Sequence, residues 1–118
     1  MTGAQFERLF IEHLKDSGYW ALRIPCNDRG AQPFDVIAIR GSNILAVDCK
    51  VCSQPRFETR RIEDNQRLAF ELMQKRTNAW CGFACYHDGN IFMIPFGDCT
   101  GASVRLETLR PKYFYWRL

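Results

Sequence analysis

The N-terminal segment has the pattern of an amphipathic helix. Apolar side chains recur at every third or fourth position between Phe6 and Leu14, which is the helical period. Thr2 followed by Gln5 matches a capping box, in which each side chain binds a backbone N–H of the first turn. Ser17-Gly18 is a stop signal. The sequence therefore predicts a helix over roughly residues 2–17.

Strand patterns and one further helix pattern follow. Short apolar runs between polar segments predict strands over residues 19–25, 34–40, 43–51, 79–86 and 91–96. A helical period predicts a second helix from about Ile62 to Arg76. Loops are expected in the segments CNDRGAQP and CSQPRFETRR.

The order of these elements, α-β-β-β-α-β-β, predicts the fold class. It is typical of an α/β fold with a mixed central β-sheet flanked by helices. We expect a single domain over residues 1–118, because a chain of this size builds one core. The tail, residues 103–118, is expected to be an irregular or short-strand segment packed by its aromatic side chains.

Composition and cysteine content limit the class of protein. Hydrophobic residues make up 47% of the chain, which is typical of a globular protein. The sequence lacks an apolar run of about 20 residues and the layout of a signal peptide, so we expect a soluble, cytoplasmic protein. In that compartment the six cysteines are expected to be free thiols. A zinc site from Cys49-x2-Cys52 and Cys81-x3-Cys85 is the alternative, although the two spacings differ.

Positive charge gathers in two segments, although the formal net charge is only +3. PRFETRR carries Arg56, Arg60 and Arg61 against one glutamate, and residues 101–118 carry four basic residues against one acidic residue. Such clusters are often solvated surface, and they are also typical of surfaces that contact nucleic-acid phosphates. Arg29, in the loop before the hairpin, is a further candidate for DNA contact.

The stretch FDVIAIRGSNILAVDCKV carries charged residues where a buried strand normally has apolar ones. Gly41-Ser42 suits a two-residue hairpin turn, so paired residue numbers sum to 83 and Asp35 faces Asp48. Lys50 shares their face, because side chains alternate along a strand. The Cβ atoms of two directly paired residues lie about 4.5–5.5 Å apart. Two carboxylates this close repel each other unless a cation or a shared proton lies between them. Either the strands end at solvent and Lys50 neutralises one aspartate, or the hairpin holds a divalent metal.

Two more polar side chains are expected to face this hairpin. Glu7 lies at the edge of the apolar arc of the first helix, so it can point toward the sheet. Gln66 lies in the middle of the apolar stripe of the second helix, so its amide should point inward and require a partner. A capped or snorkelling side chain explains either residue alone. Both together favour a polar site around Asp35 and Asp48.

A succession of short motifs resembles a known family. FERLFIEHLKDSGYWALRIP, PFDVIAI, ILAVDCK, RRIEDNQRLAFE and NIFMIPF follow one another within residues 1–96. This succession resembles the archaeal and phage Holliday junction resolvases of the PD-(D/E)xK nuclease superfamily. Pro33-Phe34-Asp35 and Asp48-Cys49-Lys50 carry the signature, with one residue between proline and the first aspartate. The second half has aspartate where glutamate is commoner.

The resemblance implies a restriction-endonuclease-like core and a metal-dependent endodeoxyribonuclease. It implies that Glu7, Asp35 and Asp48 bind Mg²⁺, for which Mn²⁺ can substitute, that Lys50 positions the nucleophilic water, and that Gln66 supports the site. It also implies a homodimer that cuts two opposed strands of a four-way DNA junction in recombination and repair, leaving 5′-phosphate and 3′-hydroxyl ends.

Two alternatives use the same residues. One is a related nuclease of the superfamily that acts on other DNA, as a restriction-like enzyme or a repair nickase. The other is a non-catalytic DNA-binding protein on the same fold, and the complete set of Glu7, Asp35, Asp48 and Lys50 argues against it. Assays on four-way junctions and linear duplex, with and without Mg²⁺, separate the three hypotheses.

Overall fold

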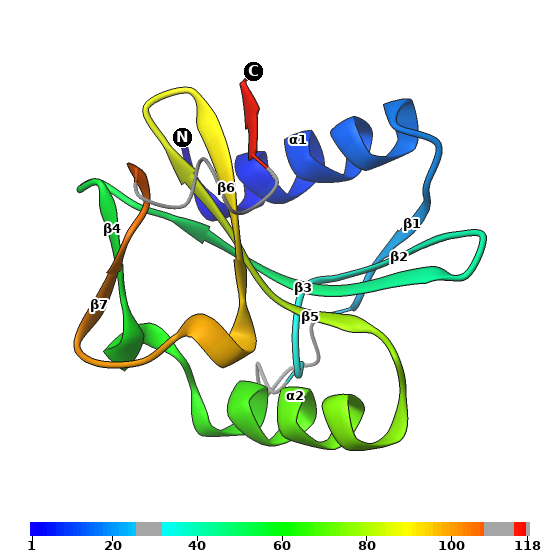
Figure 1. Ribbon diagram of the computed structural model, residues 1–118. Coiled ribbons are helices and arrows are strands. Elements are labelled where there is room, and N and C mark those ends of the chain that lie inside the picture. Colours follow the sequence, from blue (N-terminus) through cyan, green and yellow to red (C-terminus); the bar gives the residue numbers. More distant parts are fainter. Residues whose placement is uncertain (26–31, 108–114, 118) are drawn as a thin grey trace.

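A computed structural model describes residues 1–25, 32–107 and 115–117 (Figure 1). Within them the helices are α1 (Gly3–Asp16) and α2 (Asp64–Arg76). The longer strands are β1 (Trp20–Arg23), β2 (Val36–Arg40), β3 (Asn43–Val51), β5 (Trp80–His87) and β6 (Asn90–Pro95). Three short strands complete the fold: β4 (Arg56–Glu58), β7 (Ser103–Arg105) and β8 (Tyr115–Arg117).

The main sheet has six strands in the order β1-β2-β3-β5-β6-β8. Its neighbours are antiparallel except for β3 and β5, which run parallel. A parallel pair requires a crossover connection, and here it passes through β4, a 3₁₀ turn at Thr59–Arg61 and α2. β4 also pairs with β7 in a separate two-stranded sheet. The predicted mixed sheet flanked by helices is confirmed (Figure 1).

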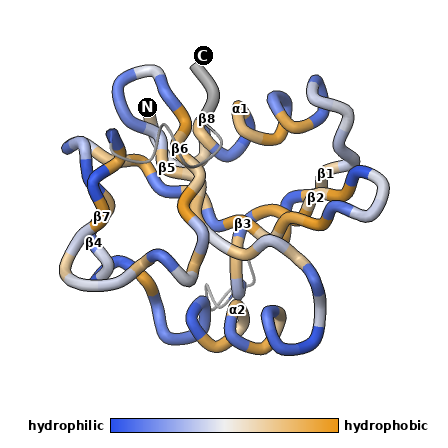
Figure 2. Tube along the Cα trace, in the orientation of Figure 1, coloured by the Kyte–Doolittle hydropathy of each residue, from blue (hydrophilic) through white to orange (hydrophobic). Residues whose placement is uncertain are grey.

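The two helices cover opposite faces of the sheet (Figure 1). On one face α1 packs Phe6, Phe10 and Leu14 against strand residues such as Val36 and Val47. On the other face Phe70 of α2 joins a second cluster, which includes Phe57, Phe83, Phe92 and Ile94. Figure 2 shows hydrophobic residues along the strands and alternating with polar ones along both helices. The strand ends that carry charge therefore lie between two packed layers.

The predicted start of α1 is confirmed. Thr2 Oγ1 accepts a hydrogen bond from the Gln5 backbone N–H at 3.1 Å, and Gln5 Oε1 accepts from the Thr2 N–H at 2.8 Å. These bonds satisfy two of the N–H groups that a helix start leaves without an intrahelical partner.

The predicted hairpin register is also confirmed. Gly41 has φ of 59°, a conformation that favours glycine, and Arg40 pairs with Asn43 across the turn. The pairing then continues in the expected register to Val36 and Val47. Asp35 directly precedes β2, so the register brings it beside Asp48.

The segment CSQPRFETRR, predicted to be a loop, contains β4. Phe57 is fully buried at the centre of this strand and pairs with Val104 of β7. A strand of three residues is too short for an alternating pattern to reveal it in the sequence. Helix α2 begins at Asp64 rather than at Ile62, because Ile62 closes the preceding turn and Glu63 caps the helix.

The tail was predicted to be irregular or to form short strands, and it forms the short strands β7 and β8. The predicted packing of its aromatic side chains and the predicted loop at residues 26–31 lie outside what the structure describes. Across the described residues, no helix is long and apolar enough to cross a membrane. The described cysteines, at positions 49, 52, 81, 85 and 99, are free thiols, as predicted.

Candidate functional site

Four of the predicted site residues come together where β2 begins and β3 ends. Asp35 and Asp48 share a side-chain hydrogen bond, and Glu7 of α1 shares another with Asp35. Lys50 Nζ lies 3.0 Å from Asp48 Oδ2. The structure therefore brings three carboxyl groups and one ammonium into one cluster, drawn from three elements of the chain.

Asp35 is fixed by backbone bonds on both sides. Its N–H donates to Val47 O at 3.1 Å, and its carbonyl accepts from the Ile24 N–H at 2.7 Å. Its carboxylate accepts from the Cys49 backbone N–H at 2.8 Å and from Gln32 Nε2 at 3.3 Å. The side chain is thus held against β3, on which Asp48 lies.

Asp48 is the most deeply buried charged residue of the cluster, with 2% of its surface exposed. Its Oδ2 forms the ion pair with Lys50 but lacks hydrogen-bond geometry to any group of the described residues. Burial raises the pKa of Asp48 to about 7; the Lys50 charge opposes this shift, and the Asp35 carboxyl adds to it. Near neutral pH the metal-free cluster therefore holds a proton on Asp48 in much of the population.

Glu7 reaches the cluster from α1, and its side chain is 13% exposed. Burial raises the pKa of Glu7, as do the hydrogen bond and negative charge of Asp35. Arg23, at the end of β1, lowers it through an ion pair of 2.9 Å to Glu7 Oε2. Arg23 was not among the predicted site residues, because a basic residue at a strand end carries no signal of its partner.

Lys50 is held at two points. Besides the Asp48 ion pair, its Nζ donates to the backbone carbonyl of Arg61 at 3.4 Å, and the side chain is 13% exposed. Arg61 in turn donates from its guanidinium to Val51 O at 3.1 Å. The turn after β4 therefore braces the strand end that carries the ammonium.

Gln66 is buried, as predicted, with 5% of its surface exposed. Its Oε1 accepts from the Glu63 backbone N–H at 3.2 Å and so completes a capping box at the start of α2. The Gln66 amide is therefore buried with a hydrogen-bond partner, which is the capped backbone N–H of Glu63. A supporting role for Gln66 toward the carboxylates stays a prediction.

The three carboxyl groups are oxygen ligands of the type that a hard divalent cation such as Mg²⁺ prefers. Burial is the main cause of the raised pKa of Glu7 and of Asp48, and the Asp35 carboxyl adds to both shifts. In the part of the chain that the structure describes, no group of three or more acidic, histidine or cysteine side chains is arranged so that it could hold a metal ion. Glu7 is paired with Arg23 and Asp48 with Lys50 instead.

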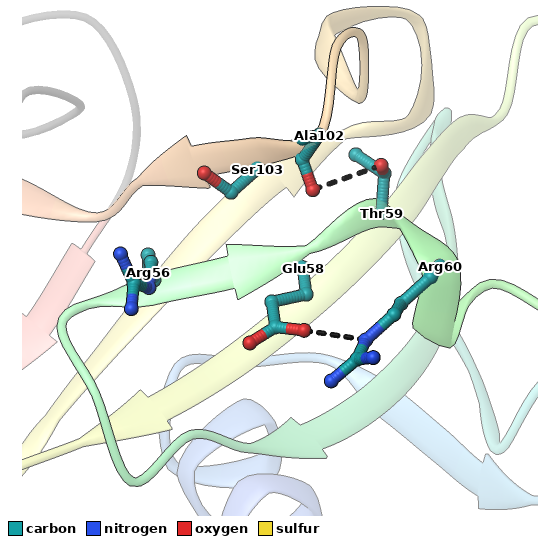
Figure 3. A pocket seen from close by; sticks show the side chains of 6 residues that line it. All are labelled: Arg56, Glu58, Thr59, Arg60, Ala102 and Ser103. Atoms are coloured by element: carbon teal, nitrogen blue, oxygen red, sulfur yellow. Dashed lines mark hydrogen bonds and ion pairs between the residues drawn. The ribbon is translucent and has the colours of Figure 1, made fainter.

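The predicted DNA-contacting arginines lie beside this cluster. Arg56 and Arg60 line an open pocket of about 470 Å³ with Thr59 and Ser103, and Arg60 forms a 2.6 Å ion pair with Glu58 (Figure 3). A neighbouring pocket of about 330 Å³ is lined by Arg61 as well. Arg29 lies outside the described residues.

Comparison of the structure shows the class of fold. The chain superposes on the 1.6 Å structure of Archaeoglobus fulgidus Hjc, a Holliday junction resolvase from an archaeal hyperthermophile, with a TM-score of 0.60. The two are 17% identical, and the match covers 91% of this chain and 89% of that one. At this identity the likeness shows the fold, which is restriction-endonuclease-like.

Comparison of the sequence shows the family. The model of the archaeal Holliday junction resolvase (hjc) family matches residues 1–98, and the chain belongs to this family. No curated protein matches the chain. Membership in a resolvase family implies that the chain is a nuclease of DNA recombination.

The raised pKa of Asp48 predicts how stability depends on pH in metal-free buffer. The folded pKa is about 7 against 3.8 for the free side chain, so the stabilisation is complete below pH 4 and is lost as pH rises through 7. Relative to Asp48→Asn, the wild type should lose on the order of 2–4 kcal/mol between pH 4.5 and pH 8.

Urea unfolding in EDTA at several pH values measures this difference. Asp88→Asn, at an exposed turn position, is the matched control and should follow the wild type. Parallel pH profiles for the wild type and Asp48→Asn would contradict the assignment.

Proposed function

We propose that the chain is a Mg²⁺-dependent, structure-selective endonuclease that resolves four-way DNA junctions by paired phosphodiester hydrolysis. The observation that carries this proposal is the convergence of Glu7, Asp35, Asp48 and Lys50 in one buried cluster of a resolvase-family chain. A non-catalytic DNA-binding protein would have no need for three repelling carboxyl groups in its interior.

Each residue of the cluster has a distinct role in this proposal. Asp35 and Asp48 would hold the cation through their carboxylates, and Glu7 would bind it or its water. When bound, the cation would place positive charge beside the scissile phosphate and lower the pKa of a water molecule. Asp48 must release its proton to act as a ligand, so cation binding and deprotonation are linked.

Lys50 supplies positive charge that the protein itself positions. Its ammonium is tied to Asp48 and to the Arg61 carbonyl, and its side chain keeps 13% exposure, so it can also reach an incoming phosphate. We assign it to orienting the attacking water and to stabilising the charge that develops on phosphate oxygens. A preoriented ammonium in a site with little water is far more effective than a solvated one.

Substitutions in the cluster should separate the ligands from the lysine. Asp35→Asn and Asp48→Asn should each abolish Mg²⁺-dependent cleavage and weaken Mg²⁺ binding, while junction binding persists because each removes negative charge that repels phosphate. Lys50→Ala should abolish cleavage with little loss of Mg²⁺ binding. Cleavage gels and calorimetric titration of Mg²⁺ measure the two effects.

The choice of substrate discriminates this proposal from its alternatives. Labelled four-way junction and linear duplex of the same sequence should be compared with Mg²⁺ and with EDTA. Preferential, Mg²⁺-dependent cutting of the junction is expected. Substantial cleavage by either asparagine variant would disprove the site, and equal cutting of linear duplex would favour a restriction-like or repair nuclease.

We also propose that the arginine cluster beside the site contacts DNA phosphates. Arg56 and Arg60 are exposed, and the exposed ion pair of Arg60 with Glu58 contributes little that phosphate binding would have to replace. The Arg61 guanidinium is directed toward β3, and the Arg61 carbonyl binds Lys50. We therefore expect that replacing Arg61 affects cleavage through Lys50 more than it affects DNA binding. Arg29 stays a weaker candidate.

Replacing Arg56 and Arg60 by alanine should weaken junction binding equally for all sequences. Each lost phosphate contact should flatten the dependence of log affinity on log salt by roughly one unit. Arg8→Ala with Lys15→Ala, on the exposed face of α1, is the charge-matched control. If the salt dependence of binding is unchanged in the variant that lacks Arg56 and Arg60, DNA binds at another surface, and the basic tail is the next candidate.

Paired cutting requires two sites, so we propose a twofold homodimer of single-domain chains. We propose that the dimer surface includes the exposed apolar side chains of β1, β2 and α2, whose exposures run from 36% to 61%: Trp20, Leu22, Ile39, Leu68 and Leu72. Trp20 and Leu22 alternate with Ala21, which packs on the α1 side, so they lie on the same side of the sheet as α2. Exposed apolar groups gathered on one side are typical of an interface.

Charge placed on this surface should dissociate the dimer. We expect Leu68→Glu with Leu72→Glu to give a monomer by light scattering, while the matched control, Gln74→Glu with Asn78→Glu, stays dimeric. Both pairs add the same charge at exposed positions, which lie within α2 for the leucines and near or just after its end for the control. A monomeric wild type that stays monomeric on junction DNA would rule out paired cutting.

A further inference from the structure

Cys52 differs from the other described cysteines in its surroundings. It directly follows β3, two residues after Lys50, and its backbone N–H donates to Tyr86 O at 2.8 Å. Its Sγ accepts a hydrogen bond from Arg61 Nη1 at 3.7 Å. It also shares a side-chain hydrogen bond with Cys85 of β5, which is fully buried. The thiol therefore lies between a guanidinium and a second thiol.

This environment favours the thiolate of Cys52. The hydrogen bond with Cys85 and the charge of Arg61 lower the pKa of Cys52 to about 7, although burial opposes them. Burial raises the pKa of Cys49, Cys81, Cys85 and Cys99. The thiolate is the reactive form of cysteine, so Cys52 is the described cysteine best prepared to react near neutral pH.

A route from solvent leads to Cys52. The side chain is 5% exposed, and it lines the pocket of about 330 Å³ that Arg56, Arg60 and Arg61 also line. A small, polar reagent can enter this pocket, whereas Cys85 lies behind Cys52 with no exposed surface. The positive lining of the pocket stabilises an anionic sulfur at its base.

Cys52 is also connected to the catalytic lysine. Arg61 donates to Cys52 Sγ and to Val51 O, and the Arg61 carbonyl accepts from Lys50 Nζ. Cys85 is the residue that pairs with Lys50 in the register of β3 and β5. A change at the Cys52 sulfur therefore acts on the two structures that hold Lys50: the Arg61 brace and the β3–β5 pairing.

We propose that Cys52 is an oxidation site, at which a small peroxide converts the thiolate to a sulfenic acid, displaces Arg61 and so disables Lys50. The thiolate sulfur attacks one peroxide oxygen, an S–O bond forms as the O–O bond breaks, and hydroxide leaves. Sulfur is oxidised by two electrons and the peroxide is reduced. Because the Arg61 guanidinium lies 3.7 Å from Sγ and binds the thiolate, we expect the added oxygen to displace it from the sulfur.

Cys85 can react with the sulfenic acid of Cys52. Its thiol attacks the sulfenic sulfur, a disulfide forms, and the hydroxyl of the sulfenic acid leaves as water with the thiol proton. Either product changes the end of β3. The effect on cleavage rests on the nuclease function proposed above, whereas the oxidation itself does not.

Peptide mapping after peroxide treatment tests the site. The full chain is reduced, exposed to hydrogen peroxide, treated with catalase and denatured in dimedone, which traps sulfenic acids. We expect a dimedone adduct at Cys52, or a Cys52–Cys85 disulfide, to form at least about tenfold faster than any product at Cys81. Oxidation of Cys81 or Cys99 before Cys52 would overturn the proposal.

The consequence for Lys50 has two readouts. Hydrogen exchange at residues 50–52 should accelerate in the oxidised wild type and recover with dithiothreitol, and this measurement requires no activity. Junction cleavage should fall at least about tenfold on oxidation in the wild type and in Cys99→Ser, but not in Cys52→Ser or Cys52→Ala.

The possible failures are distinguishable. Oxidation of Cys52 that changes neither exchange nor cleavage would overturn the link to Lys50, as would equal inactivation of Cys52→Ser. If the untreated protein cuts no junction, the proposed function fails, while peptide mapping and hydrogen exchange still decide the oxidation site and its structural effect.

Discussion

The buried carboxyl of Asp48 is the constraint on which the site depends. A carboxylate with almost no exposure is unstable unless positive charge or hydrogen bonds replace the water that it lost. Burial raises the pKa of Asp48 to about 7, although Lys50 supplies part of the missing positive charge, and the negative charge of Asp35 adds to the rise. The cluster therefore lacks enough positive charge to keep Asp48 fully ionised near neutral pH. We infer that a divalent metal supplies this missing charge.

The fold produces this deficit by bringing separate segments to one sheet end. The hairpin register places Asp35 beside Asp48, and α1 adds Glu7 from the opposite layer. The parallel pairing of β3 with β5 requires a crossover, and that crossover places Arg61 against Lys50 and Cys52. The connection that the topology demands thus also braces Lys50 and carries the exposed arginines.

The sequence predicted the parts of this arrangement that have local signals. The capping box at Thr2, the Gly41 turn and the resulting register follow from short-range rules, and they sufficed to place Asp35 beside Asp48. Strand β4 could not be predicted, because the burial of Phe57 depends on β7, which lies far along the chain. The ion pair of Arg23 with Glu7 and the helix-capping contact of Gln66 depend on side-chain geometry that no periodicity encodes.

Proton release on metal binding tests the central claim most directly. Calorimetric titration of Mg²⁺ into the wild type at pH 6.5, in two buffers with different ionisation enthalpies, gives the number of protons displaced. With a pKa of about 7 for Asp48, binding should release roughly three-quarters of a proton or more at this pH and almost none at pH 8.5. Binding heats that are the same in both buffers at pH 6.5, or no Mg²⁺ binding at all, would contradict a buried carboxyl that exchanges its proton for the metal.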